Sequence, residues 1–504
     1  MRYFSTILCF LFFFSLSASA QQSRQIKFVK ARTIEYDKAI AADAQRALGE
    51  VVFEHEGSFL YCDSAWFYTN RNAIDAFGNV HIKMSDTLNI YSDKLTYNGA
   101  DKTAQLIDNV KLIDKQTTLT TNKLLYDRKT EIAYYNEGGK IIDKENTLTS
   151  VKGYYFTREK NFFFKDKVAL INPQYVIYSD TLLFNTETEV AYFFGPTDIV
   201  SKENTIYCEN GWYNTKTDIA SFGINSHLKN KNQYLEADSF YYDRVRNFGK
   251  AYQNVVIFDS TQNITLTGNY AEYNRYDKLS FITDSAAAIM AKNTDSLFLH
   301  ADVLTVEFDS LQTTRNMFAY NHARFFSKDL QGSCDSLVYN ATDTLITMYS
   351  APVLWADKNQ LSADTIVVLL RNKQLDQLKL FSSAFIISKS DSLQFNQLKG
   401  KFMHGFLSNN KLYKINVQGN AESIYYANED NGAHLGINKA IAISMTIWLA
   451  ENKIQSIVFF EKPEATLYIP TELSQKEQKL KNFNWQISKR PVDRFDIFRI
   501  INPE

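Results

Sequence analysis

The sequence predicts an all-β protein in which similar two-strand units of about 29 or 30 residues follow one another along the chain. The first observation behind this prediction is a pattern of apolar, small and acidic positions that recurs at this interval. The second is the composition, because aromatic residues and Asn, Asp, Thr and Ser are plentiful whereas proline and glycine are scarce. Such a composition is typical of many strands separated by polar turns.

The first residues of the chain have the character of a secretory signal peptide. Arg2 supplies a positive start, residues 7–16 form a short apolar run, and residues 17–20 are small. We therefore expect residues 1–20 to be a signal peptide cleaved after Ala20, and the mature protein to be periplasmic. The apolar run is shorter than the roughly 20 residues that a membrane-spanning helix requires.

The repeat is clearest in residues 88–98, which read Leu-Asn-Ile-Tyr-Ser-Asp-Lys-Leu-Thr-Tyr-Asn. Related copies occur in residues 176–185, 234–243 and 332–340. The aromatic position near the end of the motif marks the period, because Phe67, Tyr97, Tyr126 and Phe156 follow one another at intervals of 30, 29 and 30 residues. A second extended segment lies between successive markers, so each unit is predicted to contain two strands and two turns.

The position of the apolar residues predicts a corner within each unit. Leu88 and Ile90 share one face of a strand, as do Leu95 and Tyr97, because side chains alternate along a strand. The parity changes at Ser92-Asp93, where a bend or bulge would return both pairs to one core. We expect neighbouring units to stack about 4.8 Å apart, which gives a β-solenoid or an open, folded-over sheet.

The pattern becomes weaker after Leu370, and this divides the mature chain into three regions. Residues 21–370 are predicted to form the regular repeat domain, and residues 371–470 an irregular continuation of the β-array that includes a strand at 454–460. Residues 471–504 are polar and charged, and we expect a terminal cap or tail, since the end units of repeat arrays are usually atypical.

Three cysteines of the mature chain occupy the same place in the repeat, directly before the corner acid: Cys62, Cys208 and Cys334. Units that are several repeats apart cannot bring Cα atoms within the roughly 7 Å that a disulfide needs, so we expect free, buried thiols. The corner acids form a row that could bind calcium, but the Gly-Gly-x-Gly-x-Asp pattern of calcium solenoids does not occur. A role in stabilising the turn is favoured, and no metal or cofactor is predicted.

The sequence gives no indication of an enzyme or of a nucleic-acid-binding protein. The histidines are scattered, and there is no nucleophile elbow, phosphate loop or dinucleotide fingerprint. The formal net charge is −1, without a basic run that carries aromatic residues, which argues against nucleic acid as a partner.

The motif Leu-x-Ile-x-Ser-Asp-x-Leu-x-Tyr, followed by a strand such as residues 106–113, resembles the OstA-like family of periplasmic lipopolysaccharide-transport proteins. The resemblance covers roughly residues 26–370. It implies an elongated β-jellyroll opened into a V whose inner face holds the acyl chains of lipid A. It also implies end-to-end self-association, and partners in an inner-membrane extraction complex and an outer-membrane barrel translocon.

On this hypothesis the inner apolar face binds lipid, and the best-matched copies of the motif supply the candidate residues. These are Leu88, Ile90, Leu95, Tyr97, Leu124, Tyr126, Leu182, Phe184, Phe240, Tyr242, Leu337 and Tyr339. The expected function is the binding and transport of lipopolysaccharide towards the outer membrane, as part of outer-membrane assembly. Two alternatives remain open: a structural or adhesive solenoid with a closed, dry core, and a carbohydrate-active β-helix with acids clustered on an outer face.

Overall fold

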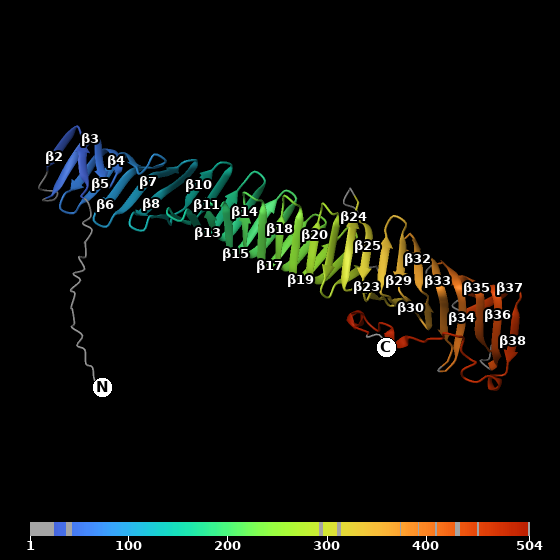
Figure 1. The fold of residues 1–504 in the computed structure, drawn as a ribbon. Coiled ribbons are helices and arrows are strands. Elements are labelled where there is room, and N and C mark those ends of the chain that lie inside the picture. Colours follow the sequence, from blue (N-terminus) through green and yellow to red (C-terminus); the bar gives the residue numbers. More distant parts are fainter. Residues whose placement is uncertain are drawn as a thin grey trace, which may run out of the picture. The chain divides into compact units, whose positions relative to one another are not determined.

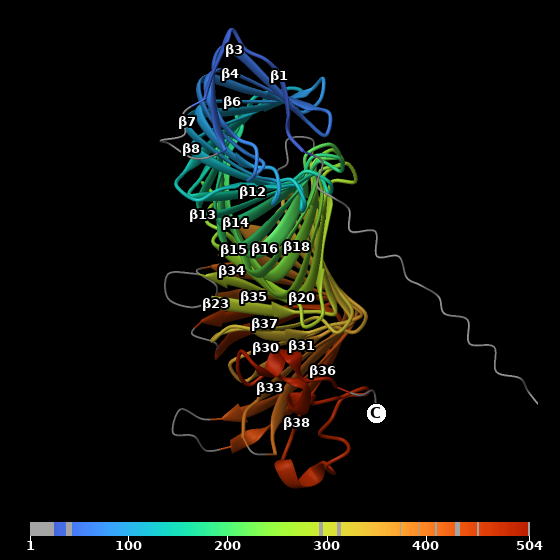
Figure 2. The same cartoon turned by 90° about the vertical axis from the view of Figure 1, so that its left-hand side faces the viewer.

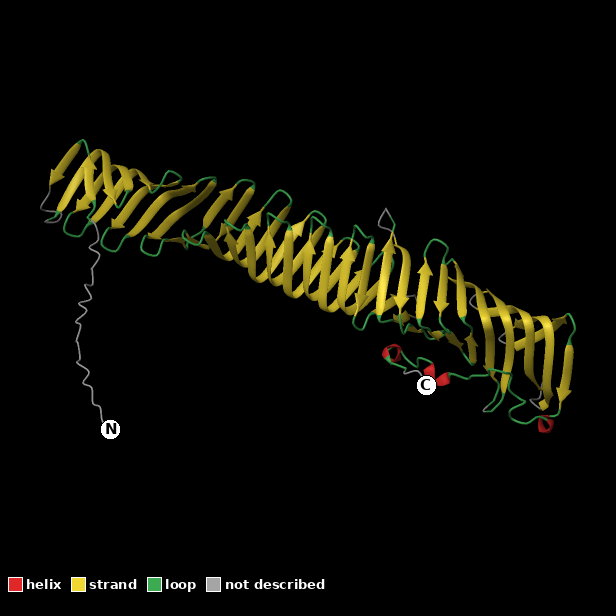
Figure 3. Ribbon diagram, in the orientation of Figure 1, coloured by secondary structure: helices red, strands yellow, loops and turns green. Residues whose placement is uncertain are grey.

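The computed structural model describes residues 25–36, 43–291, 296–309, 314–372, 374–391, 393–408, 411–428, 434–450 and 453–501. The predicted signal peptide, residues 1–20, lies outside these residues. The chain forms two compact units, residues 1–187 and 188–504. Strands make up most of each unit, and the described helices are three short 3₁₀ turns near the C-terminus (Figures 1 and 3). No helix of the described residues is long and apolar enough to cross a membrane.

The first unit is a stack of antiparallel strands, most of which pair with the strand that follows them in the chain. Its strands are β1 (Lys27–Lys30), β2 (Thr33–Tyr36), β3 (Ala44–His55), β4 (Ser58–Tyr68), β5 (Ala73–Lys83), β6 (Leu88–Asn98), β7 (Thr103–Asp114), β8 (Thr117–Asp127), β9 (Ile132–Tyr135), β10 (Gly139–Asp143), β11 (Asn146–Ser150), β12 (Lys152–Phe156), β13 (Asn161–Ile171) and β14 (Tyr175–Asn185).

The second unit continues with the same antiparallel pairing. Its strands are β15 (Val190–Ser201), β16 (Asn204–Asn214), β17 (Ile219–Asn230), β18 (Gln233–Asp243), β19 (Phe248–Asp259), β20 (Ile264–Asn274), β21 (Leu279–Thr283), β22 (Ala287–Ala291), β23 (Ser296–His300), β24 (Val303–Phe308), β25 (Thr314–Tyr320), β26 (Arg324–Phe326), β27 (Gln331–Ser333), β28 (Ser336–Asn340), β29 (Leu345–Tyr349), β30 (Val353–Ala356), β31 (Asn359–Ser362), β32 (Thr365–Arg371), β33 (Gln374–Lys389), β34 (Phe395–Ser408), β35 (Lys411–Asn428), β36 (His434–Ala450), β37 (Lys453–Phe460) and β38 (Glu464–Tyr468). The 3₁₀ turns are η1 (Pro470–Glu472), η2 (Ile487–Lys489) and η3 (Asp496–Phe498).

The predicted all-β fold of two-strand repeats is confirmed, with one correction to the spacing of the repeats. Each repeat contributes two neighbouring strands to the sheet, as β6 and β7 do. Hydrogen-bonded strands lie roughly 4.8 Å apart, so successive repeats advance by roughly twice that distance. The expected single step of 4.8 Å per repeat was too short because it counted one strand for each unit.

The predicted corner is a β-bulge on the strand that follows the Ser-Asp motif. The register between β6 and β7 shifts between Tyr91 and Lys94, opposite Asp108 and Asn109, which have φ values of 62° and 52°. Two consecutive left-handed residues turn the chain sharply, and asparagine and aspartate tolerate this conformation better than most residues. Paired left-handed residues recur at the corners of later repeats, as at Gln253 and Asn254.

The corner acids bind the side chain of the left-handed asparagine in the neighbouring strand. Asn109 Nδ2 donates to Asp93 at 2.7 Å, and Asn254 Nδ2 donates to Asp238 at 3.1 Å. At one corner a salt bridge replaces this hydrogen bond, because Lys152 takes the place of the acid and its Nζ lies 2.8 Å from the Asp166 carboxylate. These contacts agree with the expected role in the turn. The described residues contain no group of three or more His, Cys, Asp or Glu side chains placed to hold a metal.

The corners fold the sheet of each unit into two facing layers, which we call wall A and wall B. In β3, residues 44–48 belong to wall A and residues 51–55 to wall B, and the following strands divide in the same way. The curvature of the bent strands is visible in the first unit (β3 to β8) in Figure 2. Hairpin turns alternate between the free edges of the two walls, so each wall has its own row of hairpin tips.

In the second unit, between residues 279 and 371, each described strand belongs to one wall only, and the chain passes the corner between strands. Wall A then runs through β21, β24, β25, β28, β29 and β32, and wall B through β22, β23, β26, β27, β30 and β31. The long strands β33 to β36 cross the corner again, with left-handed pairs at Ser382-Ser383 and Gly419-Asn420.

The C-terminal segment, residues 470–501, runs across the outer face of wall B of the second unit. Gln360 donates to the carbonyl oxygen of Asn484 and accepts from the amide of Gln486, both at 2.7 Å. Gln397 binds the backbone of Gln478 and Leu480 in the same way, both at 2.8 Å. The side chain of Leu480 joins a buried cluster with Phe385, Ile387, Ile424, Tyr426 and Ile437.

The expectation of free, buried cysteines is confirmed for Cys62, Cys208 and Cys334. Burial raises the pKa of each of these thiols to about 12. Because the thiolate is the reactive form, none of them has the low pKa of a reactive cysteine.

Candidate functional site

A large cavity lies between the two walls of the second unit. Its volume is about 2350 Å³, well above the roughly 300–1,000 Å³ of a pocket for a drug-sized ligand. Wall A contributes residues such as Leu337, Ile346 and Ile447, and wall B contributes residues such as Leu354 and Leu398. The lining is dominated by leucine, isoleucine and other apolar side chains, so the cavity is suited to flexible hydrocarbon.

Alternation along the strands explains why the lining is apolar. Ile415, Ile447 and Ile457 are direct cross-strand neighbours in β35, β36 and β37, and all three line the cavity. Residues next to them in the sequence point to the other face of wall A, since successive side chains in a strand alternate.

Polar residues of the hairpin tips form the edge of this cavity. Thr342 on wall A and Asp329 and Asp357 on wall B line the cavity and are exposed to solvent. The cavity therefore reaches solvent along the hairpin tips. Arg490 of the C-terminal segment stands at the same edge, where it donates to the carbonyl oxygen of Asp357 at 2.9 Å.

The first unit has a much smaller cavity near its N-terminal end, with a volume of about 60 Å³. Large side chains that are almost completely buried fill the space between the walls here: Phe53, Ile74, Ile90, Leu95 and Leu106. The same folded-over sheet is therefore filled by its own side chains in this part of the chain.

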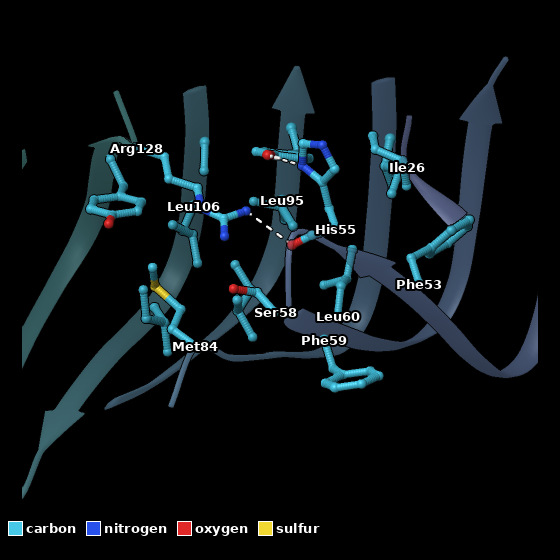
Figure 4. A pocket seen from close by; sticks show the side chains of 16 residues that line it. Ile26, Phe53, His55, Ser58, Phe59, Leu60, Met84, Leu95, Leu106 and Arg128 are labelled. Carbon is cyan, nitrogen blue, oxygen red and sulfur yellow. Dashed lines mark hydrogen bonds between the residues drawn. The ribbon is translucent and has the colours of Figure 1, made fainter. Parts of the chain in front are cut away.

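Polar side chains close one side of the small cavity (Figure 4). His55 is 6% exposed, and its Nδ1 lies 2.6 Å from the hydroxyl oxygen of Tyr97. Arg128 donates to the carbonyl oxygens of His55 and Glu56 at 3.0 and 2.9 Å. Lys102 Nζ contacts both carboxylate oxygens of Glu56 at 2.8 and 3.0 Å. The hydrogen bond from Lys102 lowers the pKa of Glu56, whereas burial raises the pKa of Tyr97.

The structure places six of the twelve candidate residues at the two cavities. Ile90, Leu95, Tyr97 and Tyr126 line the small cavity, and Leu337 and Tyr339 line the large one. The other six do not line either cavity. Of these, Leu124, Leu182 and Phe240 are buried, and Leu88, Phe184 and Tyr242 are partly buried.

Sequence reasoning missed most of the large cavity because it concentrated on the regular copies before Leu370. Residues of β33 to β37, including Leu398, Ile415 and Ile447, supply much of the lining. A weak signal was present, since residues 443–447, which read Ile-Ser-Met-Thr-Ile, alternate between apolar and polar side chains. The strands β33 to β36 are longer than the earlier ones, so their spacing departs from 29 residues and the repeat pattern could not be followed through them.

Comparison with known proteins finds a similarity to one family over part of the chain. The family model described as OstA-like protein matches residues 23–180 and 176–238. None of the curated proteins compared with the chain matches it. Among solved structures, the chain is similar to LptH of Pseudomonas aeruginosa, described as the LptA-homologous periplasmic component of the lipopolysaccharide transport device. The identity is 12%, the match covers 23% of this chain and 82% of LptH, and the TM-score is 0.21.

The family match and the observed fold agree over the same residues. The matched region contains the regular two-strand repeats, from β1 to the first half of β18. Two of its corners carry the Ser-Asp motif, at Ser92-Asp93 and Ser179-Asp180. Residues 23–238 of this chain are therefore similar to the OstA-like family in both sequence and repeat architecture.

Proposed function

We propose that this protein binds lipopolysaccharide through its acyl chains and carries it through the periplasm towards the outer membrane. The observation that carries the proposal is the apolar cavity of about 2350 Å³ between the walls of the second unit, with a polar edge at the hairpin tips. An amphiphile would place its chains between the walls and its headgroup at the tips. The OstA-like region of residues 23–238 supports the same function.

The energetics favour a ligand with several chains. Burial of hydrocarbon contributes about 0.8 kcal/mol for each CH₂ group. A single myristoyl chain binds a membrane with a constant of only about 10⁴ M⁻¹, and two membrane anchors give stable attachment. A lipid A moiety with several acyl chains would be retained by the cavity without a network of specific polar contacts.

The proposed partners are an inner-membrane extraction complex and an outer-membrane translocon. In the described residues, β37 and β38 each pair only with β36, so each leaves one edge unpaired. Unpaired edges accept further strands by β-augmentation. End-to-end association with a second copy or with a partner of similar fold would use these edges.

The test is native mass spectrometry of the purified exported protein, compared between two variants of strand β29. Ile346→Glu places a charge in the cavity, whereas Thr347→Glu places it at the neighbouring position on the opposite side of wall A. We expect lipopolysaccharide on the wild-type protein and on Thr347→Glu, and its loss from Ile346→Glu with the thermal unfolding transition retained.

Two results would contradict the proposal. One is equal lipid content in the two variants, because the cavity would then not be the binding site. The other is a wild-type protein that carries no lipid and cannot be loaded in vitro. That result would favour a structural solenoid.

A further inference from the structure

Side-chain contacts link the turn between β3 and β4 to the opposite wall at the N-terminal end of the first unit. Glu56 and Gly57 form this turn, which is a hairpin tip of wall B. Lys102 and Arg128 belong to two consecutive hairpin tips of wall A, after β6 and β8. The contacts of Glu56 with these two side chains therefore run between the free edges of the walls and not within one sheet.

The other ion pairs in the described part of the first unit lie within one wall or at a corner, although the hydroxyl of Tyr155 in wall A also donates to Asp114, beside the wall B tip after β7. In the tip after β5, Asp86 pairs at 3.6 Å with Lys83 of its own hairpin, and its side chain is fully exposed. At the first tip, by contrast, Glu56, Lys102 and Arg128 are each only 20–24% exposed. The bridge is therefore a local feature of the N-terminal end.

The bridge covers the small apolar cavity. Tyr97 and Arg128 line this cavity together with Ile26, Ile74 and Leu95. His55 and Tyr97 form a second contact between the walls directly beside it. An apolar space beneath two cations has the chemistry of a site for an anionic amphiphile, since the chain and the charge would each find a partner.

Glu56 occupies the place that the anion would take. Its carboxylate is within 3.0 Å of Lys102 Nζ at both oxygens, and one oxygen lies 3.7 Å from the Arg128 guanidinium. A phosphate group carries more charge and more acceptor oxygens than a carboxylate, and it forms strong charge-assisted hydrogen bonds with lysine and arginine. Exchange of one anion for another would remove the contacts of the Glu56 carboxylate with wall A. A phosphate that takes the Arg128 guanidinium would also compete with its hydrogen bonds to the carbonyl oxygens of His55 and Glu56, and so release the tip of wall B from wall A.

We propose that Glu56, Lys102 and Arg128 form a latch between the two walls, which opens when the phosphate headgroup of an amphiphile replaces the Glu56 carboxylate. This proposal rests on the proposed function, because it assumes that the space between the walls receives lipid chains. The latch holds the filled end of the first unit closed until a phosphorylated lipid arrives.

The first experiment measures the distance between the walls without any ligand. Spin labels are placed at Asp86→Cys and Lys129→Cys, two exposed positions on tips of opposite walls. The native cysteines are changed to serine, which other repeats carry at this place as Ser92 and Ser179. Pulsed electron paramagnetic resonance then gives the distance distribution.

Glu56→Gln should broaden this distribution and shift it to longer distances, because the ion pairs of the carboxylate with Lys102 and Arg128 are lost and only the hydrogen bonds of Arg128 to the backbone remain. The matched control is Glu422→Gln, which breaks the 2.6 Å pair between Lys399 and Glu422. That pair has the same exposure as the latch but joins two strands of one wall in the second unit. An unchanged distribution in Glu56→Gln would overturn the latch, whatever the protein binds elsewhere.

The second experiment identifies the ligand chemistry by adding three probes to the labelled protein: dodecyl phosphate, dodecyl maltoside and inorganic phosphate. The proposal expects dodecyl phosphate alone to add a long-distance population to the labelled protein. In Lys102→Gln, which lacks the main contact of Glu56, the longer distances should be present before any probe is added and dodecyl phosphate should not change them further. Opening by inorganic phosphate would show that the site takes free anions, which contradicts a lipid latch. Opening by the neutral maltoside would show that chain insertion alone separates the walls, which also contradicts it.

Failure of the proposed function is distinguishable from failure of the latch. If native lipid is absent from the cavity of the second unit while Glu56→Gln still opens the first unit, the bridge remains a link between the walls. It would then have no role in lipid passage. If lipid is present and the distance between the labels is unaffected by both Glu56→Gln and dodecyl phosphate, only the latch is wrong.

Discussion

The two units use the same repeat and differ in what lies between their walls. Both have the bulge with two left-handed residues, and both bind the corner acid through asparagine, as at Asp93 in the first unit and Asp238 in the second. In the first unit Phe53, Leu106 and similar side chains fill the interior around a cavity of about 60 Å³, whereas the second unit contains one of about 2350 Å³.

This difference shows that the corner determines the backbone conformation, whereas the size of the inward side chains determines how much empty volume remains between the walls. Small residues stand at the cavity walls of the second unit, as at Ala288 and Ala319, which are almost completely buried. Aromatic pairs occupy the interior of the first unit, where the ring centroids of Tyr155 and Phe162 lie 4.2 Å apart in a stacked pair. These two side chains are 5% and 7% exposed. The same repeat geometry can therefore enclose either a packed interior or a cavity.

The largest expected effect comes from truncation of an inward side chain in each unit. Leu106→Ala should lower the free energy of unfolding by about 2–5 kcal/mol, because Leu106 is completely buried in a filled interior. Ile346→Ala should cost clearly less, since Ile346 is partly exposed to the existing cavity. Denaturant unfolding of the full chain measures both values. Equal losses would mean that the two interiors are packed alike.

The next effect concerns the C-terminal segment, which supports wall B of the second unit. Gln360→Ala removes two hydrogen bonds to the backbone of residues 484 and 486, and leaves these groups without that partner. We expect a loss of about 1–3 kcal/mol and faster proteolysis within residues 470–501. Thr347→Ala, on wall A, is the control. Unchanged proteolysis would show that Gln360 does not hold the segment.

A smaller effect tests whether the corners of the two units are equivalent. Asn109→Ala and Asn254→Ala each remove a hydrogen bond to the corner acid and place alanine in a left-handed conformation. Each should cost about 1–2 kcal/mol, from the lost bond and the unfavourable backbone conformation. Thermal unfolding of both variants should give similar shifts, and a large difference between them would contradict a shared corner geometry.

The smallest effect is the pH dependence of the latch in the first unit. The pKa of Glu56 is lower in the folded protein than its usual value of 4.5, mainly because of the hydrogen bond from Lys102. Its contribution to stability is therefore fully present above pH 4.5 and is lost as the pH falls through the folded pKa. The difference in unfolding midpoint between wild type and Glu56→Gln should shrink from pH 7 to pH 3. A constant difference would exclude this charge effect.

Much of the fold followed from local patterns in the sequence. The spacing of Phe67, Tyr97 and Tyr126 gave the two-strand period, and the parity change at Ser92-Asp93 located the corner. The distance by which successive repeats advance along the sheet was not predicted correctly, because the sequence pattern does not show how many strands of each unit join the sheet. The left-handed pair at Asp108-Asn109 was also missed, although asparagine before a buried valine recurs at several corners.

The candidate site was only partly accessible from the sequence. Leu337 and Tyr339 face the large cavity, but Leu182 and Phe240 carry the same motif and do not line either cavity. An inward position is set by alternation along one strand, whereas an empty space depends on the side chains of the opposite wall. Those side chains come from strands that are distant in the sequence.

Local patterns in the amino-acid sequence were sufficient to predict that this protein is all-β and that its repeat has two strands and a corner. These features depend on the period of two in a strand and on local backbone preferences. The three-dimensional structure was needed to show which stretch between the walls is filled and which contains a cavity, and that Glu56 contacts Lys102 and Arg128 between the free edges of the walls. Packing and charge pairing between separate walls depend on distances in space, which no local pattern contains.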